Sequence, residues 1–95
     1  MEIIKEGHLY KLADFDGGIS QELSFIEKDA SGTLTSGTTN EEVLAMLIDR
    51  IQFLQGKFPC RENAIVITKL EESLMWLNKR TQDRKVRGVE GKQEA

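Results

Sequence analysis

The stretch from Asn40 to Gly88, NEEVLAMLIDRIQFLQGKFPCRENAIVITKLEESLMWLNKRTQDRKVRG, decides the fold. Its apolar residues return every three or four positions, the spacing of one helix face, in two series separated by a connector. The series are Leu44, Leu47, Ile48 and Ile51, then Ile67, Leu70, Leu74 and Leu77. Gly56 is expected to end the first helix in the left-handed conformation, and Pro59 suits the start of the second. The pattern predicts helices over residues 40–55 and 60–87, packed antiparallel because their link is short.

Residues before this stretch favour β structure. The segments 8–13 and 19–27 read as strands, and Asp16-Gly17-Gly18 between them tolerates the backbone of a tight hairpin turn. Residues 28–37 are rich in Ser, Thr and Gly, and they predict either a short third strand or a loop. The expected fold class is therefore α+β: an antiparallel β-hairpin of two or three strands within residues 8–37, followed by a long antiparallel two-helix hairpin.

Both ends of the helical stretch carry boundary signals. Thr39 and Glu42 have the spacing of a capping box, so the first helix is expected to start near Asn40. Residues 88–95 contain two glycines and few apolar residues, which is typical of a flexible tail. The alternative for this tail is a lid that folds over a ligand, with its glycines absorbing the backbone change.

Length and composition limit the classes of function. A chain of 95 residues with one composition over most of its length is expected to form a single domain, residues 1–95, too small to enclose a ligand deeply. A net charge of −3 argues against nucleic acid polymers and membrane surfaces, whose binders need an excess of Lys and Arg. No apolar run approaches the roughly 20 residues of a membrane span, and the amino terminus shows no cleavage-site pattern. With Cys60 as its one cysteine, the chain is expected in the cytoplasm.

A second set of apolar residues lies away from the main stripes. At about 100° per residue, Ile65 and Trp76 fall roughly opposite Ile67, and Met46 and Phe53 stand off the stripe of the first helix. One hairpin cannot cover both faces of both helices. We therefore expect a homo-oligomer, in which another copy covers the second face.

The carboxy-terminal end of the second helix is basic. Arg80, Arg84 and Arg87 repeat at i, i+4 and i+7, and guanidinium groups in such a row suit the two phosphates of a pyrophosphate. The alternative is a solvated basic helix end, favoured by the helix dipole and paired through Asp83 to Arg80 and Arg87. Gly88 follows this row directly and belongs to the same candidate site.

Two further residues have the chemistry of a nucleotide site. Phe53 lies on the outer face of its helix, where its ring could stack on an adenine, and Asn63 lies in the first turn of the next helix, where its amide could bind a base or a ribose. The alternatives are an interface aromatic for Phe53 and a capping residue for Asn63.

The sequence contains no convincing catalytic or metal-binding set. Asp14 to Gly17 resembles the start of a calcium loop, but the later ligand positions and the closing Glu are missing. His8 and Cys60 are some 50 residues apart on different elements, and neither has an orienting partner in the sequence. We expect a protein that is not an enzyme and that needs neither a metal nor a cofactor.

The chain as a whole resembles the Thoeris anti-defence family of phage proteins, in its first described type. The resemblance is carried by His8 to Leu12, Gly37 to Leu44, Phe58 to Ala64, Thr68 to Leu77, Arg80 to Arg84 and Arg87 to Gly91. It implies a sponge, that is, a protein that binds glycocyclic ADP-ribose, made from NAD by a TIR-domain enzyme, and sequesters it without cleavage in the infected bacterial cell. It also implies that Phe53 stacks on the ligand, that Asn63 reads it, and that Arg80 and Arg84 bind its phosphates.

A related family of sponges, which binds cyclic oligonucleotides of the CBASS defence, shares the Trp-Leu and Arg-Gly-Val-x-Gly portions. Cyclic di- or trinucleotides therefore remain further candidate ligands. The alternative from a different class is a protein-binding helical hairpin that docks a host protein through Phe53, Ile65 and Trp76.

Helix geometry predicts how the site is assembled. Arg80 lies 17 residues after Asn63 on one helix. At 1.5 Å per residue the two are roughly 25 Å apart, too far for one ligand of this size. The site is therefore expected between two chains, and a twofold homodimer is expected to carry two such sites. A homohexamer, as a trimer of such dimers, is the larger expected assembly.

Overall fold

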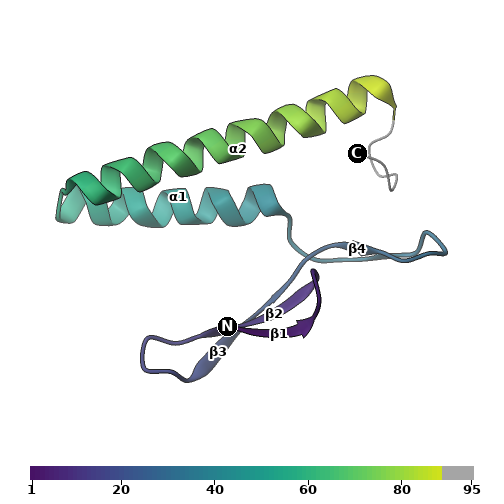
Figure 1. Ribbon diagram of the computed structural model, residues 1–95, viewed down its shortest axis with the longest axis horizontal. Helices are drawn as coiled ribbons and strands as arrows, with labels where there is room; N and C mark the ends of the chain where they lie inside the picture. Colours follow the sequence, from purple (N-terminus) through teal and green to yellow (C-terminus); the bar gives the residue numbers. More distant parts are fainter. Residues whose placement is uncertain (89–95) are drawn as a thin grey trace. The chain divides into compact units, whose positions relative to one another are not determined.

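The computed structural model describes residues 1–88, which fall into two compact units (Figure 1). The first unit is Met1–Thr39 and contains the strands, and the second begins at Asn40 and contains both helices. The expected α+β class, with an amino-terminal antiparallel sheet followed by a helical hairpin, is confirmed. That the chain acts as one domain stays a prediction.

A three-stranded antiparallel sheet forms most of the first unit. Its strands are β1 (Glu2–Lys5), β2 (Leu9–Ala13) and β3 (Ile19–Ser24), in the order β1-β2-β3. In the turn between β2 and β3, the Asp14 amide donates to the Gly18 carbonyl over 2.6 Å. Gly17 has a φ of 92°, a left-handed value that glycine adopts without strain. The predicted hairpin across this turn is therefore confirmed.

The third strand of the sheet, β1, is one that the sequence pattern did not predict. It pairs with β2 through Ile3 opposite Tyr10, and Gly7 with a φ of 77° lies in the connection between the two strands. A strand of four residues with a charge at each end is too short to show an alternating pattern. Residues 28–37 do not add to this sheet, because β4 (Glu27–Lys28) and β5 (Leu34–Thr35) form a separate two-stranded ribbon.

β3 ends at Ser24, three residues before the predicted boundary, because the next residues pair with a different segment. Phe25 forms a parallel bridge with Thr38, whose amide donates to the Ser24 carbonyl over 2.8 Å. Gly37 makes this approach possible, because a Cβ atom there would lie 2.5 Å from the Phe25 carbonyl carbon. The segment that leads into the first helix is thus held against the end of β3.

The helices are α1 (Asn40–Lys57) and α2 (Arg61–Arg87). The predicted start at Asn40 and end at Arg87 are confirmed, and Gly88, with a φ of 74°, caps α2 through its amide. The predicted left-handed cap at Gly56 is wrong. Gly56 is not among the described glycines with positive φ, and α1 continues through it to Lys57. Glycine permits a left-handed cap but does not require one, so the helix continues where its hydrogen bonds continue.

The two helices lie side by side and antiparallel (Figure 1). Near the start of α1, the Thr81 hydroxyl donates to the Glu41 carboxylate over 3.5 Å. The half-buried residues of α2 follow the predicted stripe and extend it in both directions: Asn63, Ile67, Leu70, Leu74, Leu77 and Thr81. This stripe packs against α1, as its periodicity predicts.

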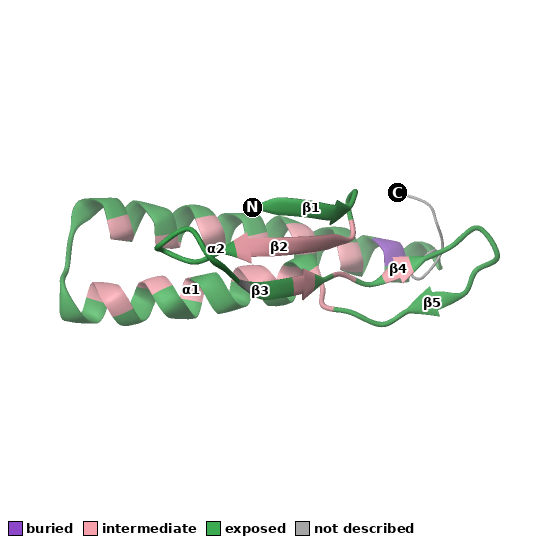
Figure 2. Cartoon of the chain, turned by 90° about the horizontal axis from the view of Figure 1, so that it is seen from below, coloured by how far each residue is buried: buried purple, intermediate pink, exposed green. Residues whose placement is uncertain are grey.

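Burial within the described residues is shallow. No apolar side chain among residues 1–88 is buried, and exposed or half-buried residues make up nearly all of both units (Figure 2). Neither helix is long and apolar enough to cross a membrane. A chain that folds with so little interior gains correspondingly little from apolar burial within one copy.

Candidate functional site

The candidate residues fall at opposite ends of the helical hairpin. Phe53 and Asn63 lie near the connector between the helices, whereas the basic cluster begins at Arg80. α2 is unbroken between Asn63 and Arg80, so their 17-residue separation corresponds to roughly 25 Å along the helix axis. One chain therefore does not bring the two sets of side chains together.

The basic end projects beyond the other helix. α2 has 27 residues and α1 has 18, and α1 begins beside Thr81. The last turns of α2, from Gln82 onward, therefore extend past the start of α1 (Figure 1). In this segment every described residue except Arg84 is exposed.

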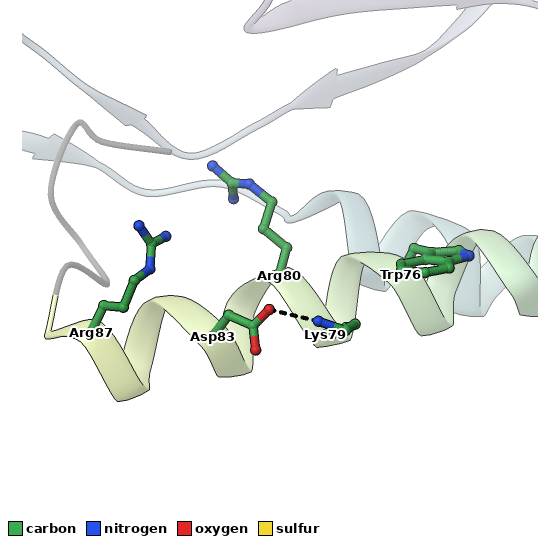
Figure 3. A pocket seen from close by; sticks show the side chains of 5 residues that line it. All are labelled: Trp76, Lys79, Arg80, Asp83 and Arg87. Carbon is green, nitrogen blue, oxygen red and sulfur yellow. Dashed lines mark hydrogen bonds and ion pairs between the residues drawn. The ribbon is translucent and has the colours of Figure 1, made fainter.

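A shallow groove of about 280 Å³ lies along α2 between Trp76 and Arg87 (Figure 3). Its lining consists of Trp76, Lys79, Arg80, Asp83 and Arg87. Arg80 and Arg87 point to the same side of the helix, which their spacing requires, because seven residues are nearly two full turns. The groove combines two guanidinium groups with an exposed indole on one chain.

The carboxylate in the groove is already paired. The Lys79 ammonium lies 2.8 Å from an Asp83 carboxylate oxygen, an i to i+4 ion pair. The alternative in which Asp83 pairs with Arg80 is therefore wrong. Within residues 1–88, the Arg80 guanidinium makes no hydrogen bond or ion pair, so its donors are available to an anion.

Arg84 differs from its two neighbours in the arginine row. Arg84 is 8% exposed and is thus the buried charged residue among residues 1–88. It does not line the groove. At about 100° per residue it lies roughly 40° from Arg80, on the continuation of the stripe that carries Leu77 and Thr81. The row is therefore not a uniformly solvated helix end, and its members have different surroundings.

Phe53 at the other end has an unpredicted neighbour. Its ring is 55% exposed, and the Lys57 ammonium lies 4.9 Å from the ring centroid, within the range of a cation–π contact. The i to i+4 spacing of Phe53 and Lys57 on α1 is the sequence signal for this pair. One face of the ring thus meets a cation.

The cap of α2 is Cys60, with φ −151° and ψ 159°, and its sulfur accepts a hydrogen bond from the Asn63 amide over 3.4 Å. The alternative role of Asn63 as the capping residue is therefore wrong. Its half-buried side chain remains a candidate for ligand contact. Gly88 caps the far end of α2, and the rest of the predicted tail or lid, residues 89–95, lies outside the described residues.

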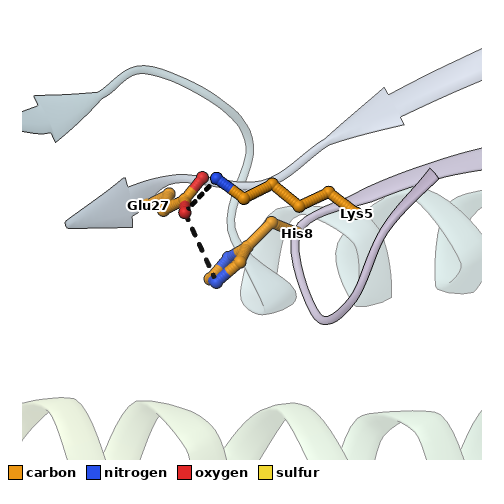
Figure 4. Close-up of polar contacts among 3 residues, drawn as sticks. All are labelled: Lys5, His8 and Glu27. Carbon is orange, nitrogen blue, oxygen red and sulfur yellow. Dashed lines mark ion pairs between the residues drawn. The ribbon is translucent and has the colours of Figure 1, made fainter. Parts of the chain in front are cut away.

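A small polar cluster occurs in the first unit (Figure 4). Lys5 and His8 both approach the same Glu27 oxygen, the ammonium at 2.5 Å and the His8 Nε2 at 3.9 Å. Cys60 belongs to the second unit, where its sulfur caps α2. Among residues 1–88, no group of three His, Cys, Asp or Glu side chains could hold a metal ion.

Comparison with known proteins identifies the family. The model of the family described as Acb2/Tad1, hairpin domain, matches residues 23–82, well over half of the chain. The chain belongs to this family. The matched range includes Phe53, Asn63 and Arg80, and the predicted relation to Thoeris anti-defence proteins is confirmed.

A curated relative from Bacillus phage SBSphiJ7, named Thoeris anti-defense 1, is 60% identical over 60 residues. The match covers 62% of this chain and 42% of that protein. The chain thus spans less than half the length of the relative.

Proposed function

We propose that this protein is a phage anti-defence protein that captures glycocyclic ADP-ribose and holds it without degrading it. A Thoeris effector deprived of this signal would stay inactive. The observation that carries the proposal is the 60% identity to a protein named Thoeris anti-defense 1, within the Acb2/Tad1 hairpin family. The signal would be met in the cytoplasm of the infected bacterial cell, where it is made.

The chemistry of the arginine end supports an anionic ligand. A diphosphate offers several oxygens in fixed geometry, and charge-assisted bonds to guanidinium groups are among the stronger hydrogen bonds. Arg80 and Arg84 are the proposed phosphate-binding residues, with Asp83, Arg87 and Gly88 beside them. Arg80 is the best placed, because within residues 1–88 it has no competing carboxylate.

The base would be bound at the connector end, by the exposed ring of Phe53 and the side-chain amide of Asn63. α2 holds Asn63 and Arg80 of one chain roughly 25 Å apart, so one chain cannot bring both to the same ligand. If the α2 helices of two copies run antiparallel, the Asn63 end of one copy lies beside the Arg80 end of the other. A twofold dimer would then carry two equivalent sites.

The shallow interior supports an assembly of copies. No apolar side chain in residues 1–88 is buried, while Met46 and Ile65 are exposed on the helices. Covering these residues with a second copy is the least demanding way to remove them from water. A homohexamer built from three dimers is the larger proposed assembly, and cyclic di- or trinucleotides are further proposed ligands.

Incubation of the full chain with glycocyclic ADP-ribose, followed by heating and mass spectrometry, tests the proposal. Capture predicts that the free ligand disappears and then returns intact when the protein unfolds. Recovery of breakdown products would indicate a hydrolase. A ligand that is never depleted would favour the alternative protein-binding hairpin, whose exposed contacts would be Phe53, Ile65 and Trp76.

Sedimentation of the free protein tests the assembly separately. The chain has a mass of 10.8 kDa, and a species of at least twice this mass is expected at micromolar concentration. A monomer that still binds the ligand tightly would contradict both the assembly and the shared site.

A further inference from the structure

Trp76 is a large aromatic side chain that the fold leaves in solvent. It is 62% exposed, although burying an indole is among the most favourable apolar contacts a chain can make. It lies one helical turn before Arg80 and lines the same groove (Figure 3). The groove therefore holds both an exposed ring and a guanidinium group that has no carboxylate partner within residues 1–88.

The groove around this ring is charged. Besides Trp76, its lining is two arginines and the Lys79–Asp83 ion pair. An apolar partner helix placed over the ring would remove the ion pair and the Arg80 guanidinium from water without replacing their hydrogen bonds, which is costly. The surroundings of Trp76 thus favour a ligand with both a flat ring and an anionic group.

The exposed apolar residues of α2 do not form one patch. Ile65 lies on nearly the same side of the helix as Trp76, eleven residues earlier, or about 16 Å along the axis. Lys69 and Glu72 lie between them on this side, and both are exposed. An interface that covers Ile65 therefore does not have to reach Trp76.

We propose that Trp76 is a ligand-binding residue, whose ring stacks on the base of a nucleotide while Arg80 binds a phosphate of the same molecule. The inference rests on the proposed function and names a second stacking surface for that site. In a site shared by two copies, Trp76 comes from the subunit that supplies Arg80, and Phe53 comes from the other. The base is then held between two rings, each contributed by a different chain.

Base stacking on an aromatic side chain contributes enough to measure. Loss of such a ring is expected to weaken binding of glycocyclic ADP-ribose about tenfold or more. Trp76→Leu removes the ring but keeps an apolar side chain that is well suited to a helix. Trp76→Phe keeps a ring, so its affinity should stay within about threefold of the natural protein.

Calorimetry of the full chain with glycocyclic ADP-ribose separates these variants, and sedimentation of each variant reports on assembly. The expected result is a large loss of affinity for Trp76→Leu, a small loss for Trp76→Phe, and one oligomeric state for all three proteins. Equal affinity of Trp76→Leu and the natural protein would overturn the inference, as would a loss that appears only together with dissociation of the oligomer. In either case the proposed function would stand.

Fluorescence tests the inference even if the cyclic ligand is not bound. Trp76 is the one tryptophan of the chain, so the indole emission comes from the groove. AMP should change this emission and ribose 5-phosphate, which lacks the base, should not, and Arg80→Ala should weaken the response to AMP. Such a response without capture of glycocyclic ADP-ribose would support the stacking site and reject the proposed function. Identical behaviour of AMP and ribose 5-phosphate would reject the stacking site.

Discussion

Gln55 and Cys60 are joined by two hydrogen bonds across the connector between the helices. The Cys60 amide donates to Gln55 Oε1 over 3.0 Å, and Gln55 Nε2 donates to the Cys60 carbonyl over 3.1 Å. Gln55 belongs to the last turn of α1 and Cys60 caps α2, so this pair ties the end of one helix to the start of the next. It also fixes the part of the chain that carries Phe53 and Asn63.

Gln55→Ala should lower the free energy of unfolding by about 1–2 kcal/mol, because each net hydrogen bond contributes on the order of 1 kcal/mol. Urea denaturation at one fixed protein concentration measures the change, since the stability of an oligomer depends on concentration. Gln52→Ala is the matched control: Gln52 is exposed one turn earlier on α1 and makes no side-chain bond within residues 1–88. Equal stability of the two variants would show that the Gln55 side chain does not stabilise the connector.

Two glycine substitutions should change stability in opposite directions. A Cβ at Gly37 would lie 2.6 Å from the Ser24 carbonyl oxygen, so Gly37→Ala must displace backbone and should cost about 1–3 kcal/mol. A Cβ at Gly56 would meet nothing within 4 Å. Gly56→Ala should therefore stabilise α1 by roughly 0.5–1 kcal/mol, the difference in helix propensity. Thermal denaturation measures both changes. A shift of the melting temperature in the same direction for both variants would contradict the described packing.

The sequence predicted the helices but not the first strand of the sheet. The helices are long, and their repeating apolar residues outweigh local preferences, so their extent was predicted within two residues at each end. β1 has four residues and no visible period, and it forms because β2 offers it a partner. Pairing of this kind is a property of the folded chain and leaves no local signal.

The pKa of Asp29 should be lower in the folded chain than in the unfolded chain. The Ser31 hydroxyl, and then the Thr33 and Ser31 amides, donate to its carboxylate and hold its pKa below the usual value of 3.8. Folding therefore favours the ionised form. The resulting contribution to the stability of the β4–β5 ribbon is complete above about pH 4 and is lost as the pH falls through the folded pKa.

Carboxyl carbon NMR shifts as a function of pH report the titration of Asp29 directly. Ser31→Ala removes the largest cause of the shift, so it should raise the pKa of Asp29 towards 3.8. Ser36→Ala, at an exposed serine that makes no described side-chain bond, should leave the titration unchanged. A titration midpoint that is the same in all three proteins would rule out the hydroxyl as the cause.

Arg80→Ala should weaken binding of glycocyclic ADP-ribose at least tenfold, since a charge-assisted hydrogen bond contributes about 1.5–3 kcal/mol. The fold should not change, because Arg80 is exposed and makes no polar contact within residues 1–88. Arg50→Ala on α1 removes a similarly exposed arginine and should bind normally. If calorimetry gives both variants the same affinity as the natural protein, Arg80 does not bind the ligand and is part of a solvated helix end.

The arginine row also shows how far sequence spacing predicts a site. Spacing placed Arg80, Arg84 and Arg87 on one side of α2, and the structure keeps two of them in the groove and buries the third. The spacing of residues does not show whether Asp83 pairs with Lys79, Arg80 or Arg87, because all three are within reach of Asp83 on a helix. The Lys79 pair is decided by side-chain conformation, which the spacing of residues does not specify.

The shared site makes a prediction that concerns two chains at once. If each site takes Phe53 and Asn63 from one subunit and Arg80 from the other, two differently disabled proteins should repair each other when they are co-expressed. A heterodimer of Asn63→Ala and Arg80→Ala would contain one intact site and one site with both defects. Arg80 is preferred over Arg84 for this experiment because Arg84 is 8% exposed, and its loss would disturb packing as well as binding.

Under random pairing, half of the dimers are mixed and each regains one of its two sites, so about a quarter of all sites should bind with full affinity. Calorimetry of the co-expressed mixture measures this fraction as the stoichiometry of the tight phase, and each variant alone should show no tight phase. Purification of the heterodimer through two different tags should raise the fraction to about one half. A verified heterodimer without any tight binding would show that one chain supplies both residues to a site. That outcome would require α2 to bend sharply between Asn63 and Arg80, where the described helix is continuous.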